Sequence, residues 1–316
     1  MILPLVRRFG VLVASVVASS LVVFAFMQVL PGNPARVALG LNASEGAVER
    51  MTTQFGLDRP LPVQYWEWAS GMLTLDPGIE YISKAAIGPQ IADRLLITLW
   101  LVGLAMALAV AIAIPLGVWM AVRHRHADGV VLTAASQIGV AIPAFLAGIV
   151  LISIFAVRLR WVPSDGWVAP AEDPVLFAKS VVLPTISLAL VQGSVLARYV
   201  RSAVLDVLRE DYLRTARAKG LTPMQALWRH GSRNAAIPVV TVMGLQLATL
   251  LVGAVVIERV FVIPGLGSLL LDSVSDRELL TVQSIVMVLV VAVLVINFIV
   301  DALYLMIDPR LKTGAR

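Results

Sequence analysis

Residues 211–238 read DYLRTARAKGLTPMQALWRHGSRNAAIP, a basic, helix-patterned stretch that lies between two long apolar runs. Around and after Asp206, apolar residues recur at spacings of three or four, which predicts a helix with one narrow apolar stripe. The residues of this stripe are Leu205, Leu208, Tyr212 and Ala216. So narrow a stripe beside so much positive charge raises the question of what the stretch contacts.

Two local signals divide the stretch into two helices. Lys219 followed by Gly220 is a helix-end signal, since a cation suits the last turn and glycine adopts the left-handed conformation that often follows it. Thr222, Pro223 and Gln225 then start a new helix, with threonine as N-cap, proline in the first position and glutamine completing a capping box. A second short helix is expected to run through Trp228. The sequence therefore predicts a helix, a sharp glycine turn and another helix.

The composition places the chain in a membrane. Of its 316 residues, 59% are hydrophobic and 14% are charged, whereas soluble domains keep roughly a quarter of their residues charged. Six apolar segments are long enough to cross a bilayer. They are residues 9–30, 95–122, 130–157, 180–205, 236–257 and 280–306. The first is too long for the apolar core of a signal peptide, which has about 7–15 residues, so it is expected to be retained.

The basic residues predict the orientation of these spans. When both termini are placed in the cytoplasm, most Lys and Arg fall in inside segments, in agreement with the positive-inside rule. Residues 1–94 then form the first span and a long extracytoplasmic loop, and residues 95–316 form a five-helix core. The basic stretch belongs to an inside loop of this core, at about 206–235. In the outside loop, PGNP at 31–34 predicts a turn, and Tyr65, Trp66 and Trp68 predict an interfacial helix over 61–75.

Three interpretations compete for the basic stretch. It is a solvated inside loop, a helix-turn-helix that binds nucleic acid, or a rigid lever that docks on a cytoplasmic protein. Matched stop and start signals are rare in solvated loops. Nucleic-acid binding is not expected, because the element is held between two spans and lacks a third supporting helix.

The stretch resembles the cytoplasmic signature loop of binding-protein-dependent ABC importer permeases. Arg214 and Thr215 replace the usual Glu and Ala, and the distance from Gly220 to Pro238 is longer than in sugar permeases. Both departures are similar to the dipeptide/oligopeptide/nickel branch. Further segments resemble this branch in order along nearly the whole chain: RRFG at 7–10, VLPGNP at 29–34, FGLDRPLPVQY at 55–65, Ile142-Pro143, FVIPGLGSLL at 261–270 and DALYLMIDPRL at 301–311. LDPGIEYIS at 75–83 departs from the GDLG-S stretch of relatives.

The resemblance implies an all-α polytopic fold of the type I ABC importer permeases, in a bacterial inner or plasma membrane. It implies four kinds of partner: a second homologous permease subunit in a heterodimer, two ATPase domains that bind ATP and Mg, an extracytoplasmic solute-binding protein, and membrane lipids. Carried over by position, the ATPase-coupling residues are Asp211, Tyr212, Arg214, Thr215, Ala216, Arg217, Lys219, Gly220 and Leu221. The residues that face the binding protein are Phe261, Pro264 and Gly265. The implied cargo is a di- or oligopeptide, with nickel chelates and haem as alternatives.

Other chemistry has little support in the sequence. There is no GxxxxGK[ST] loop, no cysteine, and no set of residues for nucleophilic catalysis, so neither a catalytic site nor a cofactor is expected in this chain. The pair His124 and His126 lacks a further ligand, so no metal site is expected. Asp301 is expected to pair with Arg310 or to reach lipid headgroups. An ion-coupled secondary transporter remains the alternative, although such proteins need acidic groups well inside the membrane.

Polar residues inside the predicted spans are candidates for a translocation path, because polar groups in a bilayer usually face the interior of the helix bundle. The candidates are Gln137, Gln192, Gln246, Thr249 and Asn297. Interhelical hydrogen bonds are the alternative role for each.

Overall fold

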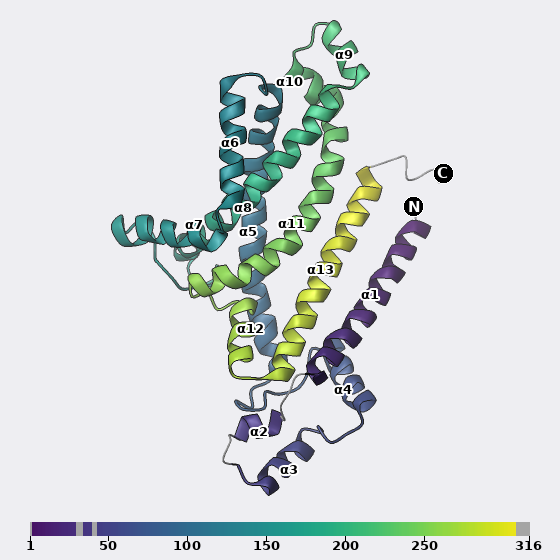
Figure 1. Ribbon diagram of the computed structural model, residues 1–316, viewed down its shortest axis with the longest axis vertical. Helices are drawn as coiled ribbons and strands as arrows, with labels where there is room; N and C mark the ends of the chain where they lie inside the picture. Colours follow the sequence, from purple (N-terminus) through teal and green to yellow (C-terminus); the bar gives the residue numbers. More distant parts are fainter. Residues whose placement is uncertain (1, 30–33, 40–42, 308–316) are drawn as a thin grey trace. The chain divides into compact units, whose positions relative to one another are not determined.

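A computed structural model of the chain describes residues 2–29, 34–39 and 43–307 (Figure 1). The described residues are mostly helical, and their only β-pairing is a single antiparallel bridge between Ile79 and Ala86. The expected all-α class is therefore confirmed. Most of the predicted turn at 31–34 and the tail at 308–316, with Arg310, lie outside the described residues.

Five long apolar helices match five of the predicted spans. They are α1 (Ile2–Val29), α5 (Ile87–Val122), α8 (Pro174–Leu208), α11 (Ser232–Val260) and α13 (Leu279–Ile307). Several extend beyond the predicted ends, because helix continues past the apolar core into polar segments. The start of α8 shows how such an end is fixed, since the Asp173 side chain accepts hydrogen bonds from the backbone N–H groups of Val175 and Leu176 at 2.9 and 3.0 Å.

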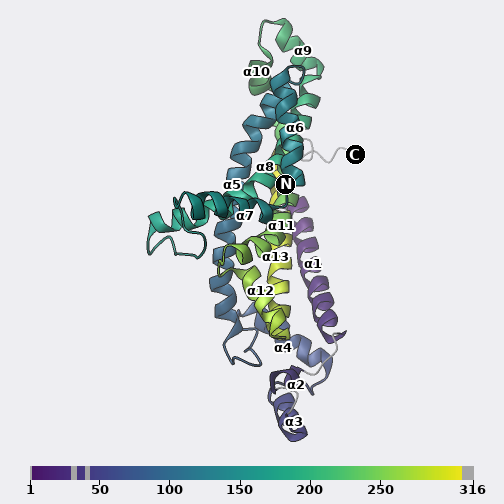
Figure 2. The same ribbon diagram turned by 60° about the vertical axis from the view of Figure 1, so that its left-hand side comes forward.

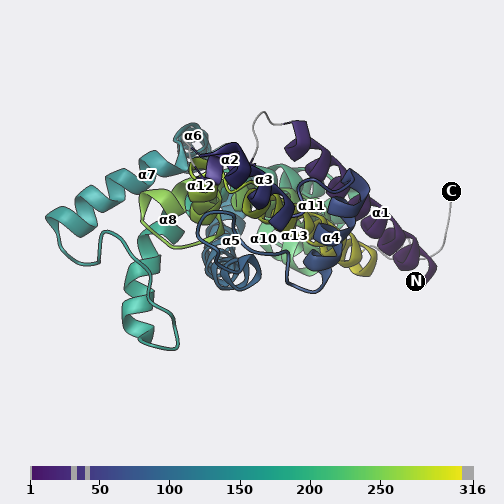
Figure 3. The ribbon, with the colours of Figure 1, turned by 90° about the horizontal axis from the view of Figure 1, so that it is seen from below.

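The segment predicted as the third span is a bent pair of helices instead of one continuous helix (Figure 2). Helix α6 (Ala127–Ala141) is followed by α7 (Ala144–Leu151), which η1 (Ile152–Arg158) continues as a π-helix, and the two directions differ by 97°. Ile142 takes an extended conformation because the ring of Pro143 disfavours helix at the residue before it. Figure 3 shows the loop that leads from η1 to the start of α8.

By backbone contacts the chain forms two compact units. Unit 1 comprises Met1–Arg8, Leu99–Ile263 and Ile296–Arg316, and unit 2 comprises Phe9–Thr98 and Pro264–Val295. The domain boundary that the sequence places after residue 94 stays a prediction.

In unit 1, α8 is the central helix and packs against α11, α6 and α7. Glycine allows a close approach of α5 to α8, because a Cβ at Gly117 would lie 2.5 Å from the Cβ of Val200. The first turns of α1 contact the end of α13 through an ion pair of 2.7 Å between Arg8 and Asp301. Asp301 therefore pairs with Arg8, and the pairing with Arg310 that the sequence suggested falls outside the described residues.

Unit 2 contains α2 (Pro34–Leu39), α3 (Glu45–Gln54), α4 (Leu61–Leu73) and α12 (Leu266–Ser275), with the adjoining parts of α1, α5 and α13. The predicted interfacial helix corresponds to α4, but two of its three aromatic residues pack inside the unit. Trp68 is buried and donates its indole N–H to Ser284 at 3.2 Å, and the Tyr65 hydroxyl lies 2.9 Å from Ser20 Oγ. Trp66 alone among the three is exposed, so it is the available membrane anchor.

Candidate functional site

The basic stretch forms the predicted helix-turn-helix, but its first helix is not continuous with the span before it. Helix α8 ends at Leu208 and α9 (Asp211–Ala218) begins after Glu210, which is extended with a ψ of 142°. This break changes which side of the helix is buried. Leu213 and Ala216 are buried, whereas Tyr212, which the sequence placed on the apolar stripe, is exposed.

Helix α9 ends in a complete Schellman motif. The Gly220 N–H donates to the carbonyl of Arg217 at 2.9 Å, and the Leu221 N–H donates to the carbonyl of Ala216 at 3.4 Å. Gly220 has a φ of +97°, a conformation that side-chain-bearing residues rarely adopt. The helix-end signal predicted at Lys219-Gly220 is therefore confirmed.

The next helix begins with the predicted capping box. Gln225 N–H donates to Thr222 Oγ1 at 3.3 Å, and Thr222 N–H donates to the Gln225 side-chain oxygen at 3.0 Å. Helix α10 (Pro223–Ala226) then passes into η2 (Leu227–Gly231), a π-helical turn that leads directly into α11. Reciprocal capping satisfies two otherwise unpaired donors, so the direction of the second helix is defined locally.

A buried apolar cluster holds this element to the ends of three spans. Its members come from α5, α8, α9, α10, η2 and α11: Val118, Ala121, Val200, Val204, Val207, Leu213, Ala216, Ala226, Leu227 and Ala235. Gly231 lies at a tight contact, because a Cβ there would be 2.8 Å from Val207 Cγ1 and 3.2 Å from Leu213 Cδ1. A hydrogen bond of 2.8 Å from the Asn234 amide to the Tyr212 hydroxyl also joins α11 to α9. These contacts join α9 directly to α8 and α11.

The outer face of the element is polar and mainly basic. Seven of the nine predicted ATPase-coupling residues are exposed: Asp211, Tyr212, Arg214, Thr215, Arg217, Lys219 and Gly220. Leu221 is half-buried and Ala216 belongs to the buried cluster. Within this face Asp211 and Arg214 form a single-turn ion pair at 3.4 Å. Trp228, exposed on η2, adds a large apolar side chain that the sequence interpretation did not select.

The structure joins two of the five translocation-path candidates. The Gln246 side-chain N–H donates to the Gln192 side-chain oxygen at 2.6 Å, which links α11 to α8. Thr249 is exposed and donates to the carbonyl of Leu245 in its own helix. Gln137 and Asn297 are exposed. The Gln192–Gln246 contact has the geometry of an interhelical hydrogen bond, and a role in translocation stays a prediction for all five residues.

The residues predicted to face a binding protein differ in accessibility. Phe261 is buried, and its ring lies against the backbone of α7, since a Cβ at Gly148 would be 2.9 Å from Phe261 Cε2. Val262 is the exposed side chain beside it, with a φ of +51°. Gly265 is buried and Pro264 is half-buried. The role of this loop stays a prediction, but Phe261 itself does not offer a free surface.

A buried carboxylate that the sequence interpretation missed organises the divergent loop at 75–83. Glu278, 3% exposed, accepts hydrogen bonds from the backbone N–H groups of Tyr81 at 2.7 Å and Ile82 at 2.6 Å. Burial, reinforced by the Glu278 charge, raises the pKa of the Tyr81 phenol from 10.0 to about 12. Glu278 directly precedes α13, and its partners lie almost two hundred residues away, so no local pattern reveals the contact.

Comparison with known proteins decides between the interpretations of this architecture. Residues 113–313 match the family described as binding-protein-dependent transport system inner membrane component, and residues 1–101 match its N-terminal region. The chain belongs to this family. It is therefore a multi-pass inner membrane protein and a permease of an ABC importer, which works with ATPase partners. The alternative of an ion-coupled secondary transporter is thereby set aside.

Similar proteins include permeases from Salmonella and Escherichia coli strains. The permease is 39% identical over 310 residues to the glutathione transport system permease protein GsiC of Salmonella choleraesuis (strain SC-B67), covering 97% of each chain. It is 38% identical over 311 residues to the protein of the same name from Escherichia coli (strain K12), covering 97% of this chain and 98% of the other.

Solved structures confirm the fold. A chain from the inward-facing MetNI methionine ABC transporter aligns with a TM-score of 0.57 at 19% identity, covering 69% of this permease and 96% of that chain. An amino acid ABC transporter crystallised with histidines aligns with a TM-score of 0.52 at 16% identity, covering 68% of this permease and 93% of that chain. These likenesses support the expected ABC importer permease fold.

Proposed function

We propose that this permease is one of two related membrane subunits of an importer for short peptides of the glutathione class. A second permease subunit pairs with it, and an extracytoplasmic binding protein delivers the peptide. The permease itself carries out no chemistry, and ATP and Mg are bound by the partner ATPase subunits. The names of the similar permeases support the substrate class, since they match this chain over nearly its whole length.

We assign the docking of the ATPase to α9, the Gly220 turn and α10. One observation carries this assignment: the element presents an exposed basic face, while its inner face is buried among the ends of α5, α8 and α11. A partner that displaces α9 therefore moves the spans as well, because Leu213 and Ala216 are packed too tightly to slide. Closure of the ATPase dimer on ATP is the ligand-driven step that biases the two states of the spans.

Charge reversal tests whether docking depends on this face or only on the positive charge of the inside loops. Arg217→Glu changes the exposed face of α9, and Arg125→Glu makes the same change in the exposed loop between α5 and α6. We expect Arg217→Glu to weaken binding of the ATPase to the reconstituted permease pair at least about tenfold, and Arg125→Glu to have little effect. Equal effects of the two variants would assign the interaction to bulk charge and contradict the docking proposal.

The substrate class is tested with the complete complex in lipid nanodiscs, together with its binding protein. Glutathione, dipeptides, a nickel chelate and haem are compared for stimulation of ATP hydrolysis. We expect glutathione or another short peptide to stimulate, and nickel chelates and haem to leave the basal rate unchanged. Stimulation by a nickel chelate or haem alone would overturn the peptide assignment without affecting the docking proposal.

A further inference from the structure

Unit 2 contains a cavity of about 680 Å³, whose lining includes no residue of the docking element and none of the translocation-path candidates. Its walls come from the outer end of α1, from α3, α4 and the loop between them, from the loop at 76–81, and from the first turns of α13. Its volume lies within the range of about 300–1,000 Å³ that is typical of sites for small molecules.

An unpaired donor lies in the wall of this cavity. Gln283 on α13 is 5% exposed, and its side-chain nitrogen has no hydrogen-bond partner in the described part of the chain. A buried amide donor without a partner costs about 1–3 kcal/mol, so such groups are rare unless something else satisfies them. A small rotation of the Gln283 amide toward the cavity would let a carbonyl or carboxylate oxygen of a ligand supply the missing acceptor.

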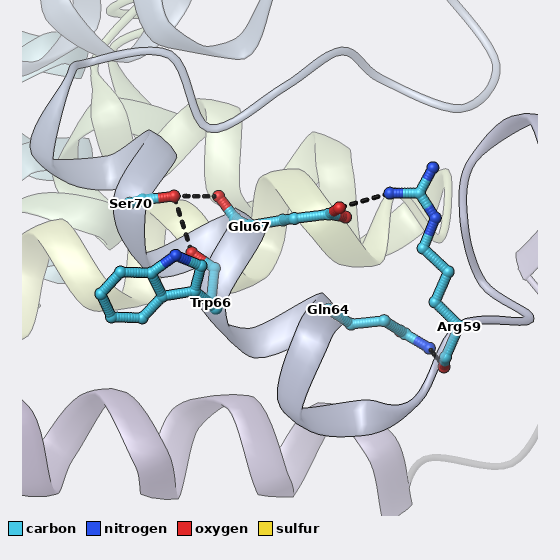
Figure 4. A network of polar contacts seen from close by, with 5 residues as sticks. All are labelled: Arg59, Gln64, Trp66, Glu67 and Ser70. Atoms are coloured by element: carbon cyan, nitrogen blue, oxygen red, sulfur yellow. Dashed lines mark hydrogen bonds and ion pairs between the residues drawn. The ribbon is translucent and has the colours of Figure 1, made fainter.

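Another part of the lining presents one charge of each sign (Figure 4). Arg59 forms an ion pair with Glu67 of α4, and each side chain is 51% exposed. The turn that carries Arg59 is fixed, because the Gln64 amide donates to the backbone carbonyls of Arg59 at 2.7 Å and Leu57 at 3.2 Å. The pair is therefore held in place while both charged groups stay accessible to a ligand.

The remaining lining residues favour a zwitterionic ligand over an anionic one. Aromatic residues Phe24, Phe55, Trp68 and Tyr81 contribute apolar surface, and Asp76 adds a second carboxylate to that of Glu67. The lining thus carries one arginine and two carboxylates, so an anionic lipid headgroup or a free phosphate would meet excess negative charge. A molecule with an ammonium group, a carboxylate and an amide between them complements every polar group named.

We infer that this cavity is a binding site on the permease for a short peptide with free termini. Glu67 and Asp76 receive its ammonium group, Arg59 receives its carboxylate, Gln283 donates to a peptide carbonyl, and the aromatic walls receive its side chains. This site rests on the proposed function, because it requires that the importer is supplied with short peptides. The peptide would occupy this site on the membrane subunit in addition to the site on the binding protein.

The test is equilibrium binding of a radiolabelled tripeptide with free termini to the complete complex in nanodiscs, without binding protein. We expect saturable binding that Arg59→Gln and Gln283→Leu each weaken by about tenfold. The matched controls are Arg36→Gln, which breaks the exposed Arg36–Glu45 pair outside the cavity, and Gln90→Leu at the start of α5. Both controls should bind as the unchanged complex does, whereas acetylated or amidated tripeptides should bind about tenfold more weakly.

Three results would overturn the inference: no saturable binding, equal losses in the control variants, or native mass spectrometry showing a phospholipid that only the cavity variants release. Binding-protein-dependent stimulation of ATP hydrolysis by the same tripeptide is measured in parallel. Stimulation without cavity binding rejects the cavity site and leaves the proposed function standing. Cavity binding without stimulation rejects the substrate class and retains the site.

Discussion

Replacing Gly220 by alanine is expected to weaken docking of the ATPase while the spans stay folded. Gly220 has a φ of +97°, and an added Cβ would have no atom within 4 Å. The substitution therefore introduces no clash, and its cost is confined to the backbone. Holding an alanine in a left-handed conformation costs about 1–2 kcal/mol. The variant can relieve this strain only by giving up the Schellman turn.

This cost sets the size of the expected effect. If docking requires the turn, 1–2 kcal/mol lowers the population of the docking-competent conformation, and with it the apparent affinity, by a factor of about 5–30. The midpoint of thermal unfolding should change little, because the buried residues of the cluster below the turn are untouched. Gly166 provides a matched control, since its φ is +95° and a Cβ there would also have no atom within 4 Å.

The assay is binding of the ATPase subunit to the permease pair in nanodiscs, measured for Gly220→Ala and Gly166→Ala side by side. We expect the loss of affinity in the Gly220 variant alone. Unchanged affinity for Gly220→Ala, or the same loss for Gly166→Ala, would refute the reasoning that this turn positions the docking face.

Three further predictions concern buried contacts. Glu278→Gln replaces one acceptor oxygen with a donor, so it should destabilise unit 2 by about 1–3 kcal/mol and speed amide hydrogen exchange at Tyr81. Glu45→Gln, at an exposed site, should do neither. Unchanged exchange at Tyr81 in the Glu278 variant would contradict the Glu278 contacts. The pKa of Tyr81, raised from 10.0 to about 12, favours the neutral phenol in the folded state, so its contribution to stability should be complete below pH 10 and fall as the pH rises to about 12. Ultraviolet titration checks this value, and Tyr81→Phe should remove this part of the alkaline loss of stability. Gly117→Ala should lower the midpoint of thermal unfolding, since the added Cβ would clash with α8. Gly103→Ala in the same helix should leave the midpoint unchanged, because its Cβ would have no atom within 4 Å. Equal midpoints for the two variants would show that α5 and α8 are not in close contact.

The sequence predicted the features that depend on neighbouring residues. The apolar lengths of five spans, the stop at Lys219-Gly220 and the capping box at Thr222 all appear in the structure. Each of them is specified within one run of residues, because hydropathy, glycine conformation and capping act over a few positions along the chain. The assignment of the basic stretch to a defined element was possible for the same reason.

Local signals were insufficient where packing decides the outcome. The sequence predicted one continuous span over 130–157, whereas the helix is interrupted at Pro143 and its direction changes by 97°, by an amount that depends on what each half of the segment contacts. The break at Glu210 rotated α9, so that Leu213 became buried and Tyr212 exposed, although the residue spacing had indicated the reverse for Tyr212.

Taken alone, the sequence determined that this chain is a helical membrane protein with a capped helix-turn-helix in its basic loop, because those properties follow from the chemistry of adjacent residues. Only the tertiary structure decided that Gln246 donates to Gln192, that Phe261 is buried and that Glu278 holds the loop at 75–83. Each of these contacts joins residues far apart in the chain. Which residues pair depends on which helices pack against one another. The packing that is adopted leaves few voids and few buried polar groups unpaired over the whole fold.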